Sequence, residues 1–296
     1  MTREMRDRHS FKPKIAIVLL SIAILTPHVR GQDAASAPPG SAQLERWKSA
    51  VLSGDPLGLK MLYSTAPAAK VTAGGKDSDV GADVSFWVGL KARNIQAEVA
   101  EASSPQPGVQ VVVFQAEIQR ASSGKTETVY VNEAQAWQQQ GDEWRLVAVQ
   151  RSDTAHLKQP LNKDKNLYPA DADARAEITE AEGKAAKEHK RVLLVFGANW
   201  CFDCHVLDLA FQRSDFAPVM AGYEVVHVDI GPDGKKNADL AKQFQVPLDK
   251  GVPALAVVEG DGKLVVSQKN GEFENARAMT PGALLEFLNK WKVESR

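Results

Sequence analysis

The chain has 296 residues, which is about twice the length of a usual single domain and leaves room for two folded domains and a leader. Its 36 Lys and Arg residues nearly balance its 37 Asp and Glu residues, which argues against a surface for nucleic acid or for acidic membrane lipids. Protein or small-molecule partners are therefore expected, and no nucleic acid.

Residues 1–31 are predicted to be a signal peptide. Basic residues precede an apolar run at 15–26, and small residues follow, with Val29-Arg30-Gly31 suited to cleavage. A membrane-spanning helix needs roughly 20 apolar residues, so a signal anchor is the weaker alternative. No cysteine follows the run, which argues against a lipoprotein. The protein is expected outside the cytoplasm, periplasmic or secreted, with a flexible connector at 32–41.

Residues 42–152 are predicted to form an α+β domain. Leu44, Trp47 and Val51 have helical spacing, and Asp55-Pro56 starts a second short helix. A polar stretch at 71–83 follows, with no element assigned to it. Strands are then expected at 95–100, 109–119, 126–138 and 144–151. Two helices followed by an antiparallel meander predict a curved sheet folded over the helices.

This order, with the start at 53–56 and the closing strand at 141–148, resembles the nuclear transport factor 2-like superfamily. The resemblance implies a cone with an apolar mouth, a fold whose members include enzymes, ligand binders and dimerisation modules. Trp87 and Trp137 could line such a mouth, although core positions are expected for both. No acid/base set stands out in this half, so binding or dimerisation is the preferred interpretation.

Residues 153–172 contain Pro160, Pro169 and a polar run, and are predicted to be an interdomain linker. An α/β domain is expected at 173–296. It starts with a helix that has Ile178, Ala181 and Ala185 on one face, and a strand at 192–196 buried on both faces follows. The later elements are a helix through 211, a strand at 223–230, a helix at 238–244, hairpin strands at 254–259 and 263–268, and a helix at 281–291. Helices are expected on both faces of this sheet.

The only two cysteines, Cys201 and Cys204, form one C-x-x-C between the buried strand and the next helix. A cysteine at a helix N-terminus is stabilised as thiolate by free backbone N–H groups and the helix dipole. Cys204, one turn later, could resolve a mixed disulfide formed at Cys201. A structural disulfide across so short a loop would stabilise the fold little. No histidine pair has zinc-site spacing, so no metal is expected, and no cofactor besides the redox-active disulfide.

The segment from the strand to the dithiol resembles the active site of the thioredoxin superfamily, and 251–253 resembles its cis-proline loop. The matching residues are Phe196, Ala198, Trp200, Cys201 and Cys204. The resemblance covers about 174–293.

It implies that Cys201 is the nucleophile and Cys204 the resolving thiol, with Trp200 as the flanking aromatic. It also implies a cis bond between Val252 and Pro253, where these two residues and Trp200 contact substrate.

Two buried positions depart from thioredoxin. Val195 stands where thioredoxins have a buried acid, and His227 stands where they have the lysine that partners it. His227 could accept the proton of Cys204, since imidazole titrates near neutral pH. The alternative is a histidine with satisfied hydrogen bonds in a buried strand.

Asp203 and His205 are candidates for tuning the redox potential. A carboxylate beside the Cys201 thiolate disfavours the charged sulfur and makes the pair more reducing, by about 30 mV for each pKa unit. Equally, Asp203 could be a solvated first-turn acid that favours the helix dipole. His205 lies four residues after Cys201, where its cation could offset Asp203.

The sequence therefore predicts an exported thiol–disulfide oxidoreductase, a reductase or isomerase acting through Cys201 and Cys204. Its expected partners are disulfide-containing or thiol client proteins, with a membrane thiol carrier as candidate electron donor and a homodimer through the N-terminal domain as a further candidate. The alternative is a ligand-binding or dimerisation protein built on the N-terminal cone, with the second domain as an accessory redox sensor.

Overall fold

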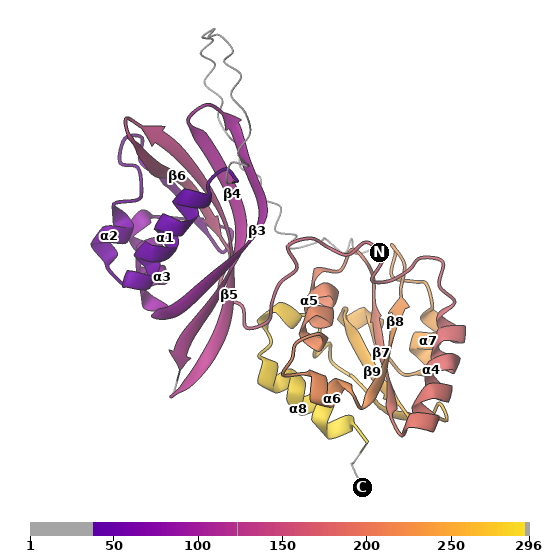
Figure 1. Cartoon of the computed structure of the whole chain (residues 1–296). Helices are drawn as coiled ribbons and strands as arrows, with labels where there is room; N and C mark the ends of the chain where they lie inside the picture. The colour runs from indigo at the N-terminus through magenta and orange to yellow at the C-terminus, as the bar shows by residue number, and fades with distance from the viewer. Residues whose placement is uncertain (1–37, 123, 294–296) are drawn as a thin grey trace, which may run out of the picture. The chain divides into compact units, whose positions relative to one another are not determined.

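The computed structural model describes residues 38–122 and 124–293, which form two compact units (Figure 1). The first unit runs to residue 126 and includes 132–153, and the second comprises 127–131 and the chain from 154 onward. The predicted signal peptide lies outside the described residues, as does the connector up to residue 37. Among the helices that are described, none is long and apolar enough to cross a membrane.

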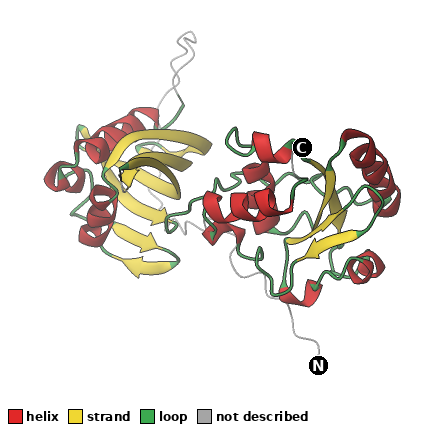
Figure 2. Cartoon of the chain, turned by 90° about the horizontal axis from the view of Figure 1, so that it is seen from below, coloured by secondary structure: helices red, strands yellow, loops and turns green. Residues whose placement is uncertain are grey.

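Three helices and six strands make up the first unit. The helices are α1 (Ser41–Ser53), α2 (Pro56–Lys60) and α3 (Val80–Gly89). The strands are β1 (Lys70–Ala73), β2 (Lys76–Ser78), β3 (Ala92–Gln106), β4 (Val109–Ser122), β5 (Lys125–Gln140) and β6 (Glu143–Arg151). The sheet order is β2-β1-β6-β5-β4-β3, and β1 pairs with β6 in parallel. The helices lie on one face of the curved sheet (Figure 2), so the predicted α+β architecture is confirmed.

The first two helices begin and pack as their residues predict. Leu44, Trp47 and Val51 form the buried face of α1. The Asp55 carboxylate accepts hydrogen bonds from the N–H groups of Leu57 and Gly58, at 2.9 and 3.0 Å, and so caps α2.

The polar stretch at 71–83, for which no helix or strand was predicted, is structured. It holds most of β1, all of β2 and the start of α3. Gly74 and Gly75 join β1 to β2 with φ values of 55° and 79°, the left-handed conformation that a tight hairpin turn requires. Asp79 caps α3 through the Ala82 N–H at 2.9 Å. Strands this short carry almost no periodicity, whereas the Gly-Gly pair was a usable turn signal.

Aromatic side chains fill the space between the helices and the sheet. Trp47 lies edge-on to Trp87 at 4.7 Å between ring centroids, and to Phe114 at 5.2 Å. Trp87 and Trp137 are both fully buried, which confirms their expected place in the core.

A polar cluster is buried beside these aromatic rings. Asp83 on α3 is inaccessible, accepts a 2.6 Å hydrogen bond from the Tyr63 hydroxyl and pairs with Arg151 Nε at 2.5 Å. Glu133 on β5 is equally inaccessible and accepts a hydrogen bond from Gln135. Burial, and then the nearby charge of Asp83, raise the pKa of Glu133 well above its ordinary value. Folding therefore favours the protonated carboxyl at this position.

Glu133→Gln should stabilise the protein above pH 4.3, the approximate pKa of an unfolded Glu, because only the unfolded state then loses a proton. The gain grows with pH until the folded pKa is reached, at about 1.4 kcal/mol for each unit by which folding raises that pKa. Urea unfolding at pH 4 and pH 8 measures it. Glu101→Gln, at an exposed position of β3, is the matched control. An equal effect of Glu133→Gln at both pH values would contradict the assignment.

The second unit is an α/β sandwich. Its helices are α4 (Ala174–Glu188), α5 (Phe202–Phe211), α6 (Ala217–Met220), α7 (Ala238–Gln243) and α8 (Pro281–Trp291), with 3₁₀ turns η1 (Leu248–Lys250) and η2 (Ala276–Ala278). Its strands are β7 (Arg191–Gly197), β8 (Tyr223–Asp229), β9 (Ala254–Val258) and β10 (Leu264–Ser267), in the order β10-β9-β7-β8. β7 pairs in parallel with β8 and antiparallel with β9.

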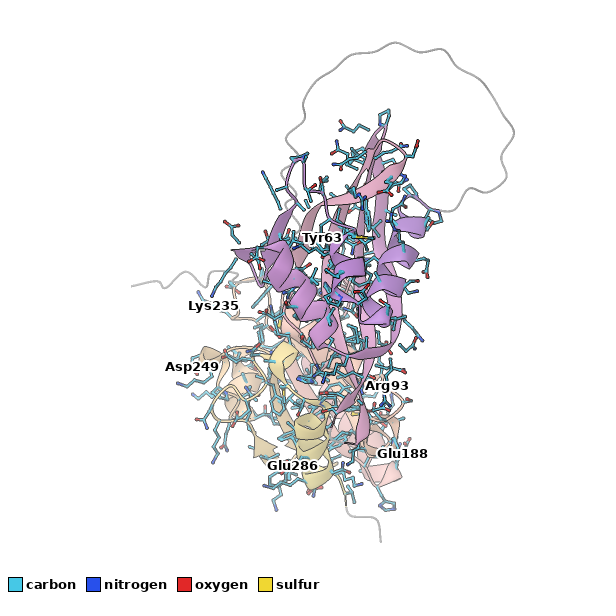
Figure 3. The ribbon with its side chains drawn as sticks, turned by 90° about the vertical axis from the view of Figure 1, so that its left-hand side faces the viewer. Tyr63, Arg93, Glu188, Lys235, Asp249 and Glu286 are labelled. Atoms are coloured by element: carbon cyan, nitrogen blue, oxygen red, sulfur yellow. A yellow bond between two sulfur atoms is a disulfide. The ribbon has the colours of Figure 1, made fainter. Side chains whose placement is uncertain are left out.

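Each face of this sheet has its own core. α4 and α7 cover one face, while α5, α6 and α8 cover the other (Figure 1). Residues 192–197 of β7 are all buried, as the unbroken apolar run predicts. The predicted α/β class is therefore confirmed, and the structure adds α6, η1 and η2. Exposed charged side chains of this unit include Glu188, Lys235, Asp249 and Glu286, and Arg93 is an exposed one of the first unit (Figure 3).

The predicted linker at 153–172 is not an exposed tether. From residue 154 it belongs to the second unit, and Leu157 and Tyr168 within it are fully buried. Leu157 joins the core beneath α5, and Tyr168 packs against Cys201 and Cys204. These apolar anchors stand among prolines and polar residues, which concealed them in the sequence. Residues 157–170 are called the strap below.

Candidate active site

Cys201 and Cys204 lie at the start of α5 and are joined by a disulfide, with 5.4 Å between their Cα atoms. Cys201 is the N-cap of the helix, and its sulfur accepts a hydrogen bond from the Cys204 N–H at 3.1 Å. Cys201 is 5% exposed and Cys204 is 1% exposed. Sulfur at this position faces free N–H groups and the positive end of the helix dipole, which stabilise a Cys201 thiolate.

The loop before β9 approaches the same sulfur. The Val252 carbonyl oxygen lies 3.5 Å from Cys201 Sγ, and the Val252–Pro253 bond is cis, as predicted. Trp200 is 39% exposed, and its Nε1–H donates to the Gly231 carbonyl at 3.0 Å. The structure thus brings together the predicted nucleophile, the proline loop and the flanking aromatic at the rim of the dithiol.

Asp203 is not a solvated acid, contrary to one of the two predictions for it. It is 8% exposed and accepts hydrogen bonds from Arg277, at 2.9 Å from the backbone N–H and 3.0 Å from Nε. The guanidinium carbon of Arg277 also lies 4.5 Å from the centre of the Phe202 ring. The charge of Asp203 beside Cys201 is therefore balanced by a cation that the sequence analysis did not identify.

His205 lies in the same first turn of α5. It is 3% exposed, and its Nε2 lies 3.0 Å from the Asn199 carbonyl oxygen. A carbonyl oxygen only accepts, so Nε2 carries the proton of this hydrogen bond. His205 therefore braces the loop before the dithiol, and its predicted offset of the Asp203 charge stays a prediction.

His227 lies beside the turn of α5 that follows Cys204. It pairs in register with Val195 across β7 and β8, and its Nε2 is 3.4 Å from Asp208 Oδ1. Asp208 follows Cys204 by four residues on α5, and therefore lies on the same helix face. An acid is thus present near the resolving cysteine, on the helix rather than on the strand where Val195 stands.

The strap closes the site from outside the sheet. The Asn199 side chain exchanges two hydrogen bonds with the backbone of Tyr168, at 2.8 and 2.7 Å. Lys163 Nζ donates to the Trp200 carbonyl at 2.8 Å. A Cβ on Gly197 would lie 2.4 Å from the Tyr168 hydroxyl oxygen and 2.6 Å from Cys204 Sγ, so glycine leaves the space that both atoms occupy.

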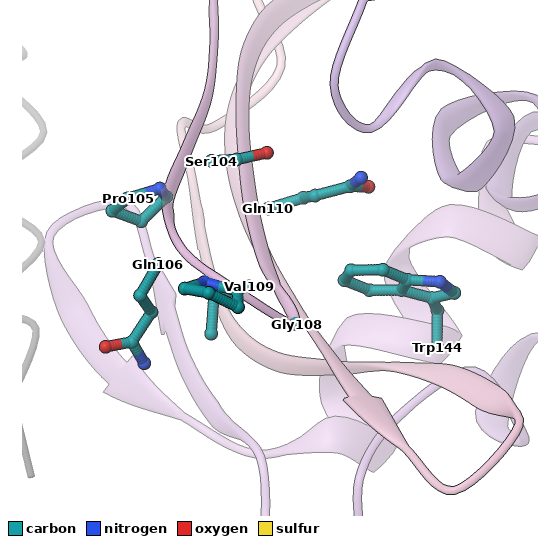
Figure 4. Close-up of a pocket in the computed structure, with 8 residues that line it drawn as sticks. Ser104, Pro105, Gln106, Gly108, Val109, Gln110 and Trp144 are labelled. Atoms are coloured by element: carbon teal, nitrogen blue, oxygen red, sulfur yellow. The ribbon is translucent and has the colours of Figure 1, made fainter. Parts of the chain in front are cut away.

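The first unit has a hollow of its own at the β3–β4 turn (Figure 4). Its volume is about 450 Å³, and Pro105, Gly108, Val109, Gln110 and Trp144 are among its lining residues. No titratable side chain lines it, so it offers no acid/base chemistry. Among the residues that the structure describes, no group of three or more His, Cys, Asp or Glu side chains is arranged to hold a metal ion.

Three residues of the dithiol environment escaped the sequence analysis. Asp208 could have been found, because it lies one turn after Cys204 on the predicted helix. Arg277 is 74 residues from Asp203, and no local pattern connects them. Tyr168 stood in a segment interpreted as a linker, where an aromatic between Leu167 and Pro169 was the only signal.

Comparisons with known proteins agree with this site. A family model described as thioredoxin-like matches residues 173–260. A disulphide isomerase of Xylella fastidiosa is 37% identical, over 42% of this chain and 95% of that chain, with a TM-score of 0.40. Residues 173–260 thus form a thioredoxin-like domain.

Two further proteins are similar to parts of the chain. The thiol:disulfide interchange protein DsbD 2 of Pseudomonas aeruginosa is 27% identical over 96 residues, which are 32% of this chain and 15% of that relative. An NTF2-like protein of Rhodospirillum rubrum is 22% identical, over 38% of this chain and 96% of that one, with a TM-score of 0.32.

Asp203→Asn and Arg277→Gln should move the redox potential of this thioredoxin-like dithiol in opposite directions. Asp203→Asn leaves the cation of Arg277 near Cys201, which favours the thiolate and raises the potential. Arg277→Gln leaves an unbalanced carboxylate, which lowers it. Shifts of about 30 mV for each pKa unit are expected, measured by equilibration in dithiol buffers. Shifts in the same direction would contradict the charge balance described above.

Proposed function

We propose that this protein is an extracytoplasmic thiol–disulfide oxidoreductase that reduces or isomerises disulfides of client proteins. The observation that carries the proposal is the Cys201–Cys204 disulfide at the start of α5, with Cys201 as the N-cap. A sulfur that is oxidised here and stabilised as a thiolate when reduced is suited to accept and return electron pairs.

In the reducing direction, the Cys201 thiolate attacks one sulfur of a client disulfide. A bond forms between the two sulfurs, and the other client sulfur leaves as a thiolate. Cys204 then attacks Cys201 Sγ, which releases the second client thiolate and restores the intramolecular disulfide. The client gains two electrons, and the dithiol loses two. A donor dithiol must return them, for which a membrane thiol carrier is our candidate.

Cys204 must lose its proton before it attacks, and His227 with Asp208 is the proposed acceptor. The two side chains lie 3.4 Å apart, beside the turn of α5 that follows Cys204. Trp200, Val252 and Pro253 are proposed to contact the client, since they surround Cys201 and Trp200 is exposed. Asp203, together with Arg277, is proposed to tune the redox potential, and His205 is proposed to hold the loop before the dithiol in place.

The direction of exchange in this proposal is supported by the names of the relatives, a disulphide isomerase and a thiol:disulfide interchange protein. The charge of Asp203 alone does not determine it, because Arg277 balances that charge. A redox potential near −120 mV, the strongly oxidising end for such proteins, would contradict a reductase or isomerase.

The first unit is proposed to bind a client, a ligand or a second protomer. Its hollow at the β3–β4 turn is the observation that keeps the alternative function open, in which ligand binding is primary and the dithiol is an accessory sensor. Export rests on the predicted signal peptide at 1–31, and removal of that segment from the mature protein tests it.

Cys201→Ser should abolish the acceleration of insulin reduction by dithiothreitol that the protein provides, because the attacking cysteine is lost and Cys204 is 1% exposed. Cys204→Ala should instead retain a mixed disulfide with clients at Cys201, visible as adducts on non-reducing gels. Asp249→Asn, at an exposed position after α7, is a control that should leave both assays unchanged.

If deletion of the gene causes a cellular defect and the Cys201→Ser protein corrects that defect, the alternative function would be favoured. Adducts formed equally well by Cys201→Ser with Cys204 intact would contradict the assignment of the nucleophile.

A further inference from the structure

Tyr168 has a buried hydroxyl that the proposed mechanism does not use. The residue is fully buried, and its hydroxyl oxygen has no hydrogen-bond partner among the described residues. A buried hydroxyl without a partner costs free energy, so its position calls for a physical reason. The reason lies in what the hydroxyl faces.

The hydroxyl lies beside the resolving cysteine. Tyr168, Cys201 and Cys204 form one buried cluster, and the Tyr168 hydroxyl and Cys204 Sγ occupy the space left free by Gly197. The ring stands edge-on to His227, with 5.2 Å between the ring centroids. In the disulfide state the hydroxyl makes no hydrogen bond to Cys204 Sγ, whose electron pairs are those of a neutral and weakly accepting sulfur.

The strap holds the ring in this place. Asn199 binds both the N–H and the carbonyl of Tyr168, and the carbonyl of Ala170 accepts from Lys236 Nζ at 2.7 Å. Lys236 also pairs with Asp229 at the end of β8. These hydrogen bonds hold the strap at Tyr168 itself and at Ala170, so the position of the hydroxyl is fixed before the dithiol is reduced.

We propose that the Tyr168 hydroxyl donates a hydrogen bond to the Cys204 thiolate and thereby speeds the resolving step; the proposal rests on the function proposed above. When the disulfide is reduced, Cys204 must carry a negative charge at a site that is 1% exposed. An O–H donor beside the sulfur can turn to the thiolate once the charge forms, and it replaces the water that burial removes.

The proton balance assigns Tyr168 as a donor only. The Cys204 proton passes to His227 and Asp208, the thiolate attacks Cys201 Sγ, and the bond between Cys201 and the client sulfur breaks with its electron pair on the client. Burial, and then the charges of Asp208 and Asp229, raise the pKa of Tyr168, so the phenol keeps its proton throughout.

Several charged or titratable groups surround this step. Asp208 belongs to α5, His227 and Asp229 to β8, and Lys236 to the segment after β8. The pH dependence of resolution therefore reports on this set together with Tyr168, and the test compares variants that leave all four residues in place.

The test uses the full chain, reduced and mixed with dithiobis(nitrobenzoate) in a stopped-flow instrument. Attack by Cys201 releases one nitrothiobenzoate, and attack by Cys204 on the mixed disulfide releases the second. Tyr168→Phe should leave the first phase unchanged and slow the second by roughly tenfold to a hundredfold, as expected for loss of a hydrogen bond to a charged group. The pH midpoint of the second phase should move upward.

Tyr223→Phe is the matched control. Tyr223 is the first residue of β8, and its buried hydroxyl donates to the Leu288 carbonyl at 2.7 Å. This substitution therefore also removes a buried hydroxyl, but at the end of β8 that is distant from the dithiol. Its second phase should match that of the unmodified protein. Oxidised Tyr168→Phe should unfold at no lower temperature than the unmodified protein, because its hydroxyl has no partner to lose.

Three results would overturn the proposal: an unchanged second phase and pH midpoint in Tyr168→Phe, equal slowing of both phases, or the same slowing in Tyr223→Phe. Dithiobis(nitrobenzoate) is a small disulfide, so the measurement does not depend on any client. Normal two-phase release without insulin reduction would contradict the proposed function and leave the assignment of Tyr168 standing.

Discussion

The chemistry of the second unit depends on one constraint: Cys204 must become an anion where almost no water reaches it. The N–H of Cys204 bonds to Cys201 Sγ, so this backbone donor serves the nucleophile rather than the resolving sulfur. Val195 in the neighbouring strand is apolar. The polar side chains nearby are Tyr168, the proposed donor to the Cys204 thiolate, and His227 with Asp208, the proposed acceptor of its proton.

The two sulfurs consequently have different electrostatic environments. Cys201 lies at the positive end of α5, and the charge of Asp203 in the first turn is balanced by Arg277. The helix dipole therefore acts on Cys201 without net opposition from a carboxylate. Cys204 lies one turn further on, in a buried cluster with Tyr168, whose ring stands edge-on to His227. A single helix start thus supplies a nucleophile at the helix N-cap and a second thiol one turn further on.

Local patterns were sufficient to predict the central part of this arrangement. The apolar run of β7, the C-x-x-C and the Gly-Val-Pro loop each carry their meaning within a few residues, and all three were found where they were expected. Arg277 and Tyr168 act through tertiary contacts, 74 residues from Asp203 and 31 residues from Asn199, so no local pattern connects them to the site.

In the first unit, the buried polar cluster was not predicted, for a different physical reason. Glu133 and Gln135 belong to β5, and strand residues of this polarity are normally solvated. Nine consecutive positions of β5 are buried, however. Gln135 donates to Glu133, and the Trp137 indole N–H donates to Gln135. Asp83 on α3 and Arg151 on β6 form an ion pair in the same cluster. The helix α3 was not predicted, so the polar cluster could not be either.

Two residues that distinguish this dithiol lie outside the segment that matches the thioredoxin-like model. That segment covers residues 173–260, which include both cysteines, His227 and the cis proline. Tyr168 precedes it in the strap, and Arg277 follows it in η2. The matched segment thus provides the reacting sulfurs, and the flanks provide the counter-charge of Asp203 and the donor facing Cys204. Because a thiolate is stabilised by its nearest charges and donors, the potential and proton handling of this dithiol are determined by the flanks as much as by the two residues between the cysteines.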